Sequence, residues 1–220
     1  MLIGTVKEGD DAVGGADRVM RGLVQRHGPC TLRKGRGDHF AALVESIVYQ
    51  QLAGKAAAAI HARFVGQFDA GLTPEHVSAA PDGVFTRAGL SRAKTASIRD
   101  LAAKVADGTV PLRGIGRLKD EDVIERLVAV RGIGRWTAEM FLMFQLGRLD
   151  VWPVDDYGVR KGYARAYGLP DLPKPKELAA FGERFRPYRS VAAWYCWRAV
   201  ETLTPAVAAV KTPKKPRRRS

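Results

Sequence analysis

The sequence predicts an almost entirely helical protein, and three stretches carry this prediction. From Phe40 to Val48, and again from Val123 to Val128, apolar residues recur three and four positions apart, which is the spacing of one face of a helix. Residues 55–60 read Lys-Ala-Ala-Ala-Ala-Ile, a run of high helix propensity. With 220 residues and 46% hydrophobic content, the chain can bury the core of one or two compact domains.

The other helices are predicted from their caps and stops. Asp17 is of the residue type that caps a helix start, while Gly168 and Pro170 are of the types that end one. The first sixteen residues are rich in Gly and Asp and show no clear period. The expected helices cover residues 18–25, 40–49, 55–68, 74–80, 85–90, 95–106, 122–129, 136–145, 157–167 and 191–203.

The centre of the chain is a two-glycine turn between two apolar helices. Gly132 and Gly134 leave backbone N–H groups bare on either side of Ile133, whose side chain we expect in the core. The N-terminus of the helix that follows favours an anion, so a phosphate of nucleic acid is the expected partner. Arg131 and Arg135 bracket the turn and add positive charge.

The same five letters, Arg-Gly-Ile-Gly-Arg, occur twice in the chain. The copy at 113–117 follows Pro111 and lacks apolar helices on both sides, whereas the copy at 131–135 has them. A lone two-glycine turn is more often a plain connection between packed helices. We therefore interpret the first copy as a loop and the second as part of a helix-hairpin-helix over residues 122–145.

Two adjacent carboxylates follow the hairpin in the segment Asp150-Val-Trp-Pro-Val-Asp-Asp-Tyr157. This segment, together with Gly132-Ile-Gly-Arg-Trp-Thr-Ala138, resembles the helix-hairpin-helix DNA glycosylase superfamily, and within it the 3-methyladenine DNA glycosylase II (AlkA-like) branch. The resemblance spans about 40–197. It implies that Asp156 is the catalytic carboxylate and that Asp155 is structural. An N-cap of the next helix is the simpler role for either aspartate and is compatible with catalysis.

The resemblance implies a two-lobed helical fold with an active-site cleft between the lobes and without the N-terminal sheet domain of AlkA enzymes. The expected parts are an N-terminal segment packing with the C-terminal lobe (1–37), a central helical bundle that includes the hairpin (38–145), a C-terminal lobe with the catalytic loop (146–207) and a disordered basic tail (208–220).

The resemblance also implies a monofunctional DNA glycosylase in base excision repair. Such an enzyme flips an alkylated purine, of the 3-methyladenine or 7-methylguanine type, out of double-stranded DNA, hydrolyses the N-glycosidic bond and leaves an abasic site. Relatives that also cut the strand carry a lysine where this chain has Trp136, and indole is not such a nucleophile. Two alternatives stay open: a non-catalytic lesion- or structure-binding DNA protein of the same fold, and an architectural DNA binder that relies on its tail.

A cationic base is attracted to electron-rich aromatic faces. By resemblance Trp197 matches the family's pocket tryptophan, and the expected substrate pocket comprises Trp136, Trp197, Tyr157 and Tyr49. Core packing is an equal alternative for Trp136 and remains an alternative for Trp197. For Trp194 we favour the core. Met140 stands where the bacterial AlkA enzyme has a pocket aromatic, which leaves the lesion range open. Thr137 joins Gly132, Gly134, Arg131 and Arg135 in the expected DNA-binding set.

A side chain that enters the duplex offsets part of the cost of extruding a base. By resemblance, Gln50, Gln51 and Leu52 are the candidates for this intercalating residue, and a polar turn that caps the helix is the alternative for each. Arg92 and Lys94 could meet phosphates, although a solvated surface is the simpler role for both.

The resemblance further implies a sodium or potassium ion on the backbone carbonyls of Val128, Val130 and Ile133. No other cofactor is expected. Cys30 and Cys196 are too few for the four-cysteine iron–sulfur loop of endonuclease III relatives, and the four histidines lack the spacing of metal ligands.

The net charge of +13 suits a polyanionic partner. Six of these charges lie in 211–220, which leaves +7 for the rest of the chain. No run approaches the roughly 18 apolar residues of a membrane span, and no secretory signal is visible at the N-terminus. We therefore expect a cytoplasmic, nucleoid-associated monomer that binds DNA and no membrane.

Overall fold

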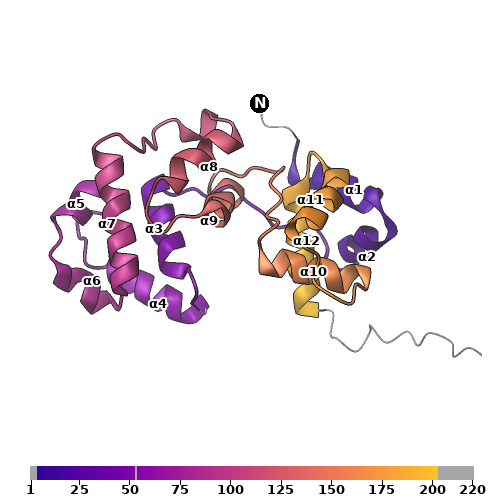
Figure 1. The fold of residues 1–220 in the computed structure, drawn as a ribbon, viewed down its shortest axis with the longest axis horizontal. Coiled ribbons are helices and arrows are strands. Elements are labelled where there is room, and N and C mark those ends of the chain that lie inside the picture. Colours follow the sequence, from indigo (N-terminus) through magenta and orange to yellow (C-terminus); the bar gives the residue numbers. More distant parts are fainter. Residues whose placement is uncertain (1–3, 53, 203–220) are drawn as a thin grey trace, which may run out of the picture. The chain divides into compact units, whose positions relative to one another are not determined.

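The protein is represented by a computed structural model that describes residues 4–52 and 54–202. Within these ranges every regular element is a helix, which confirms the all-helical prediction (Figure 1). No helix in the described ranges is long and apolar enough to cross a membrane. The basic tail expected at 208–220 lies outside the described residues.

The chain forms two compact units. Among the described residues, the first combines 4–31 with 152–202, and the second runs from Leu32 to Val151. Residues 32–37, expected with the N-terminal segment, lie in the second unit, where the Gly35 N–H donates to the Phe144 carbonyl at 2.8 Å and the Gln145 side chain donates to the Gly37 carbonyl at 2.8 Å. Residues 146–151, expected with the C-terminal lobe, also lie there, and the N–H groups of Leu146 and Arg148 donate to the carbonyls of Phe141 and Leu142.

The second unit holds the hairpin and the helices that support it. The five apolar residues that predicted its first helix, Phe40, Leu43, Val44, Ile47 and Val48, are all buried. The elements are α3 (His39–Tyr49), α4 (Gly54–Val65), α5 (Pro74–Ala79), α6 (Asp82–Ala88), α7 (Arg92–Ala106), the 3-10 turn η1 (Ile115–Arg117), α8 (Asp120–Val128), α9 (Arg135–Met140) and the π-helix η2 (Phe141–Gln145).

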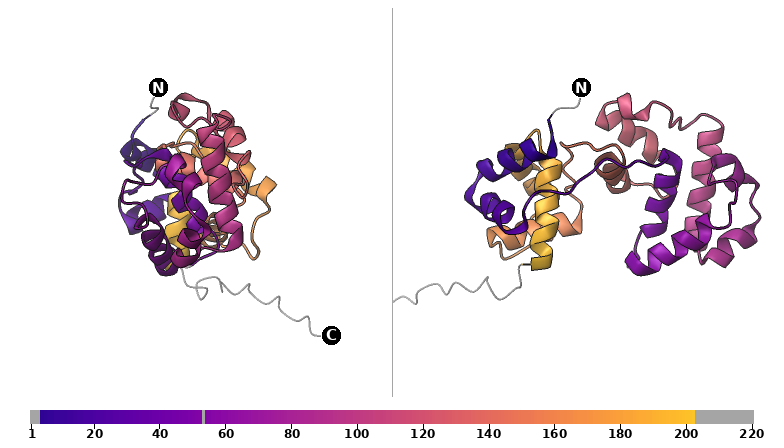
Figure 2. Two further views of the ribbon diagram at one scale, coloured as in Figure 1. Left: turned by 90° about the vertical axis from the view of Figure 1, so that its left-hand side faces the viewer. Right: turned by 180° about the vertical axis from the view of Figure 1, so that it is seen from behind.

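The first unit joins both ends of the chain around its last helix. Helix α12 packs against α10, α2 and α1, and Figure 2 shows it in yellow beside the indigo N-terminal helices. Trp194 is buried on this helix, as expected. The elements are α1 (Val6–Ala16), α2 (Arg18–His27), α10 (Tyr157–Tyr167), α11 (Pro175–Gly182), the 3-10 turn η3 (Glu183–Phe185) and α12 (Arg189–Thr202).

Helix α1 lies in the stretch that showed no period. Its start is fixed by a capping box, in which the Thr5 hydroxyl accepts from the Glu8 N–H and the Glu8 carboxylate accepts from the Thr5 N–H. Gly9 is buried against Val191 of α12, where a Cβ would lie 2.8 Å from the valine Cγ2. The glycine therefore permits close packing of two helices rather than breaking one.

Candidate active site

The hairpin forms as the two-glycine pattern predicts. Helix α8 ends at Val128, and α9 begins after Gly134, its N-cap residue. Gly132 has a φ of 77°, in the left-handed region that favours glycine. Ile133 is 3% exposed and plugs the turn into the core, and its N–H donates to the Val130 carbonyl at 3.1 Å. The copy at 113–117 forms only the short turn η1.

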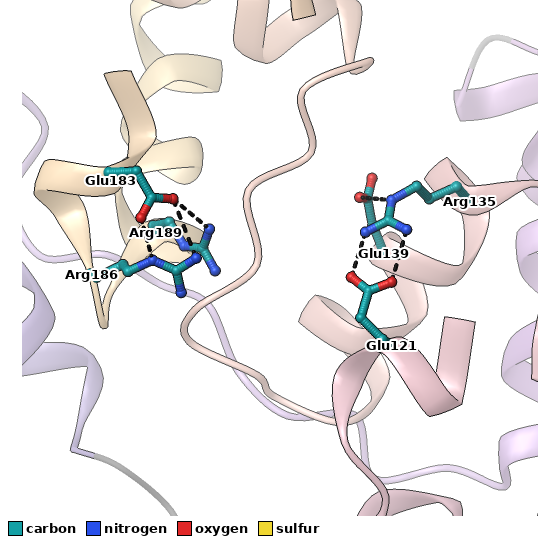
Figure 3. A network of polar contacts seen from close by, with 6 residues as sticks. All are labelled: Glu121, Arg135, Glu139, Glu183, Arg186 and Arg189. Carbon is teal, nitrogen blue, oxygen red and sulfur yellow. Dashed lines mark hydrogen bonds and ion pairs between the residues drawn. The ribbon is translucent and has the colours of Figure 1, made fainter. Parts of the chain in front are cut away.

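Arg135, expected at a phosphate, forms ion pairs with residues of the hairpin helices. Its guanidinium donates two hydrogen bonds to Glu121, at 2.6 and 2.9 Å, and one to Glu139 at 3.2 Å (Figure 3). Hydrogen bonding to Glu121 raises the pKa of Arg135, and the same bonds hold the pKa of Glu121 below its ordinary value. Arg135 therefore links α9 to α8 through Glu121, while its bond to Glu139 stays within α9.

The other expected DNA-binding residues divide into exposed and buried ones. Gly132, Gly134 and the Arg131 side chain are exposed beside the turn, as a phosphate contact requires. Thr137 is 3% exposed, and its hydroxyl accepts a hydrogen bond from the Gln50 side chain at 3.2 Å. Thr137 is thus a support beneath the hairpin, because its hydroxyl is committed inside the protein.

A pocket of about 390 Å³ lies beside the hairpin in the second unit. It brings together two of the expected substrate-pocket residues, Tyr49 and Trp136, and adds Met140 and Phe144. Trp136 is 40% exposed, which excludes core packing as its role. Residues 136, 140 and 144 recur every four positions along α9 and η2, so this spacing could have found Phe144. The remaining lining residues are Glu45, Ser46 and Thr137.

Asp156 lies in the first unit, at the end of a firmly anchored segment. The Trp152 indole is buried and donates to the Leu178 carbonyl at 2.8 Å, and the Asp156 N–H donates to the Pro153 carbonyl at 3.1 Å. Asp156 itself is 8% exposed, whereas Asp155 is exposed. The segment thus turns the second of the two aspartates inward.

The Asp156 carboxylate is held by two N–H donors. Its Oδ1 accepts from the Val159 backbone N–H at 2.7 Å and from the Trp197 indole Nε1 at 2.8 Å. The first bond makes Asp156 the N-cap of α10, the role that was open to either aspartate. The second brings together the predicted catalytic residue and the predicted pocket tryptophan.

Two glycines allow Trp197 to reach Asp156. Gly158 and Gly162 face α12 from successive turns of α10, and a Cβ at Gly162 would overlap the Cys196 carbonyl. A Cβ at Gly158 would lie 2.7 Å from Trp197 Cδ1 and 3.1 Å from Asp156 Oδ1. Burial, together with the charge of Asp156, raises the pKa of the Cys196 thiol. The four-residue spacing of the glycines is the sequence signal that could have found this contact.

Tyr157 is the expected pocket residue that the structure supports least. Its ring is 61% exposed on the first turn of α10, and the Lys161 ammonium lies 5.3 Å from the ring centroid. The ring therefore already faces a cation of its own helix.

The three candidates for the intercalating residue lie in the turn after α3, and their surroundings differ. The Gln50 side chain donates to the Gly132 carbonyl at 2.9 Å and to the Thr137 hydroxyl, so it is tied to the hairpin. Gln51 has a φ of 57°, and Leu52 is 39% exposed. The polar-turn role fits Gln50, while Gln51 and Leu52 keep the geometry of residues that could enter a duplex.

Of the three backbone carbonyls expected to hold an alkali ion, that of Val130 accepts the Ile133 N–H. A carbonyl oxygen has two lone pairs, so one remains for an ion. Among the described residues no group of His, Cys, Asp or Glu side chains could hold a metal ion. Cys30 and Cys196 are both buried.

An exposed two-glycine hairpin, an aromatic pocket and a buried carboxylate beside an indole are the features of a helix-hairpin-helix protein that works on DNA bases. The chain belongs to the HhH-GPD superfamily of base excision DNA repair proteins, whose family model matches residues 44–187.

Individual relatives agree with this assignment. DNA-3-methyladenine glycosylase 1 of Schizosaccharomyces pombe is 37% identical over 167 residues, which cover 73% of this chain and 72% of that protein. The solved structure of a 3-methyladenine DNA glycosylase from the same organism, in complex with abasic DNA, has a TM-score of 0.80 at 33% identity and covers 87% of this chain and 95% of that chain. DNA-3-methyladenine glycosidase from Bacillus halodurans gives 0.77 at 36% identity, with 88% and 89% covered.

Proposed function

We propose that this protein is a monofunctional DNA glycosylase that removes alkylated purines, of the 3-methyladenine and 7-methylguanine type, from double-stranded DNA and leaves an abasic site. The observation that carries the proposal is the buried Asp156 carboxylate, fixed in one orientation by the Val159 N–H and the Trp197 indole. The names of the relatives support the substrate class.

Asp156 supplies what breakage of the N-glycosidic bond requires. An alkylated purine carries positive charge and leaves readily, so the group that needs stabilisation is the oxocarbenium-like sugar. A carboxylate held in a mostly buried position stabilises that charge electrostatically and can orient the attacking water. Because the N–H donors fix the carboxylate before the reaction, little reorganisation is needed when charge develops.

The pocket beside the hairpin selects the base by its charge. The rings of Tyr49 and Trp136 line it, and each such ring can favour a cationic purine by roughly 0.5–2 kcal/mol. Phe144, 44% exposed, adds a third aromatic face.

The hairpin binds the DNA backbone in this proposal. Its bare N–H groups around Gly132 and Gly134 meet a phosphate, and the carbonyls of Val128, Val130 and Ile133 would hold a sodium or potassium ion that adds positive charge there. Gln51 or Leu52 fills the space that the flipped base leaves. The protein acts as a monomer in the cytoplasm, associated with the nucleoid.

Strand cleavage is no part of the proposed reaction. A β-lyase step needs an amine nucleophile of lowered pKa, and the position that carries it in bifunctional relatives is Trp136 here.

The test is base release from methylated duplex DNA, with free bases followed by chromatography before any alkaline treatment. Release of 3-methyladenine or 7-methylguanine, with strand breaks only after alkali, supports the proposal. Tight binding without release of any base would contradict it and favour a non-catalytic lesion-binding protein. Strand breaks without alkali would contradict the monofunctional assignment.

A further inference from the structure

Helix α7 carries a stripe of polar side chains on one face. Lys94, Ser97, Asp100 and Lys104 are spaced three or four residues apart, so they lie in a row along the helix. Each contacts one of two segments, the turn after α3 or the hairpin. Neither segment is adjacent to α7 in sequence.

Lys94 holds the end of α3. Its ammonium donates to the Val48 carbonyl at 2.7 Å and to the Gln50 carbonyl at 2.9 Å. The last carbonyls of a helix lack partners within the helix, and a cation there is favoured by the helix dipole. Burial lowers the pKa of Lys94, as expected for an ammonium that is partly withdrawn from water. Lys94 is thus turned inward, and the open role of a phosphate contact does not fit it.

The rest of the stripe holds the hairpin. Gly132 packs so closely on the Ser97 hydroxyl that a Cβ would overlap it. The Asp100 carboxylate accepts the Arg131 N–H at 2.7 Å, and Lys104 donates to the Ala129 carbonyl at 2.6 Å. Burial alone would raise the pKa of Asp100, but hydrogen bonds from Lys104 and the Arg131 N–H hold it below its ordinary value.

Gln50 connects the two segments directly. Its carbonyl accepts from Lys94, and its side-chain amide donates to the Gly132 carbonyl and the Thr137 hydroxyl. One residue therefore connects α7, the turn after α3 and the hairpin.

We propose that Lys94 and Gln50 are positioning residues for base displacement, which hold the turn 50–52 in one fixed position relative to the hairpin. When the hairpin binds a phosphate, Gln51 and Leu52 are already aimed at the base stack. A turn without this support would have to be ordered during binding, and the free-energy cost of ordering it would slow base flipping. The inference rests on the proposed function, since it assigns a role in the same reaction.

The decisive variant is Lys94→Met, which keeps the length of the side chain but removes its charge and its donors. Base release is measured with enzyme in excess, and extrusion is followed by the fluorescence of 2-aminopurine placed beside the lesion. We expect the maximal rate and the fluorescence rise to fall about tenfold, while the concentration dependence changes less than about twofold. Lys94→Arg should restore most of the rate. Lys119→Met, which removes an exposed lysine before α8, serves as the charge-matched control and should behave as wild type.

A second variant keeps the inference falsifiable if Lys94→Met does not fold. Gln50→Met removes both side-chain donors and should reproduce the same loss, and the double variant should lose no more than either single one. A lower melting temperature with wild-type extrusion and release in a folded variant would overturn the inference, because Lys94 would then serve stability alone. Full additivity in the double variant would overturn it as well.

Amide hydrogen exchange separates this inference from the proposed function. In Lys94→Met the Leu52 amide, which donates to the Tyr49 carbonyl at 3.3 Å, and the Arg131 amide should both exchange faster. This readout needs no base release. If wild type released no base but both amides exchanged faster in the variant, the proposed reaction would be wrong, while the coupling between the turn 50–52 and the hairpin would hold. Unchanged exchange at both amides would refute that coupling.

Discussion

Gly158→Ala tests whether the contact between Trp197 and Asp156 is needed for the reaction. The added Cβ would lie 2.7 Å from Trp197 Cδ1, whereas ordinary contact between carbon atoms is about 3.5–4.0 Å. The indole must therefore retreat by about 1 Å. The hydrogen bond from Nε1 to Oδ1, now 2.8 Å, would lengthen beyond the range of a hydrogen bond.

A misplacement of this size can cost about 10²-fold in rate. We expect the single-turnover rate of base release to fall by about that factor, with duplex affinity unchanged, because the hairpin lies in the other unit. Alanine favours a helix over glycine by about 1 kcal/mol, and overpacking typically costs about 1–3 kcal/mol. The free energy of unfolding should thus fall by no more than about 2 kcal/mol.

The matched control is Gly22→Ala, also within a helix, where an added Cβ would meet nothing within 4 Å. This variant should gain up to about 1 kcal/mol in stability and keep full activity. A folded Gly158→Ala variant that releases bases at the wild-type rate would refute the argument that the indole must hold the carboxylate.

Three further predictions concern other parts of the molecule. Arg135→Met removes the bonds to Glu121 and Glu139, so chemical denaturation should show a free energy of unfolding lower by about 1–3 kcal/mol. The salt dependence of DNA binding should stay the same, and a shallower salt slope would mean that Arg135 contacts a phosphate. Burial raises the pKa of Tyr163 to about 12, above its unfolded value near 10, so its contribution to stability is complete below pH 10 and is lost as the pH rises towards 12. Denaturation across this window should show a smaller decline in Tyr163→Phe than in wild type, and an equal decline would contradict the assignment. Trp136→Lys should produce no strand cleavage without alkali, since an amine also needs positioning and a lowered pKa; borohydride trapping of a covalent DNA complex would show otherwise.

Much of the fold could be predicted because it depends on local patterns. The apolar stripe of α3 and the two-glycine turn each identify an element within a few residues, and both formed as expected. Helix α1 was missed because its stretch is rich in Gly and Asp and shows no period, and the packing of Gly9 on Val191 of α12 explains one of these glycines. A glycine that serves close packing cannot be told from a flexible one until its partner is known.

The candidate site was predictable where chemistry marks a residue and less so where packing decides its role. Asp156 and Trp136 stand out by residue type and position, and the structure leaves the first buried and the second half exposed. The contact of Arg135 with Glu121, a residue of the other hairpin helix, could not be predicted from its charge alone. The sequence left Gln50 between entering the duplex and forming a polar turn, and its hydrogen bond to the hairpin favours the turn.

The central claim is that Asp156 drives base release, and a pair of neighbouring variants tests it most directly. Asp156→Asn and Asp155→Asn make the same chemical change at a buried and an exposed aspartate, one residue apart. Both should bind methylated duplex DNA as wild type does. Asp156→Asn should lose nearly all release of 3-methyladenine and 7-methylguanine, while Asp155→Asn should retain it. Wild-type release by Asp156→Asn, or its loss in Asp155→Asn alone, would contradict the account.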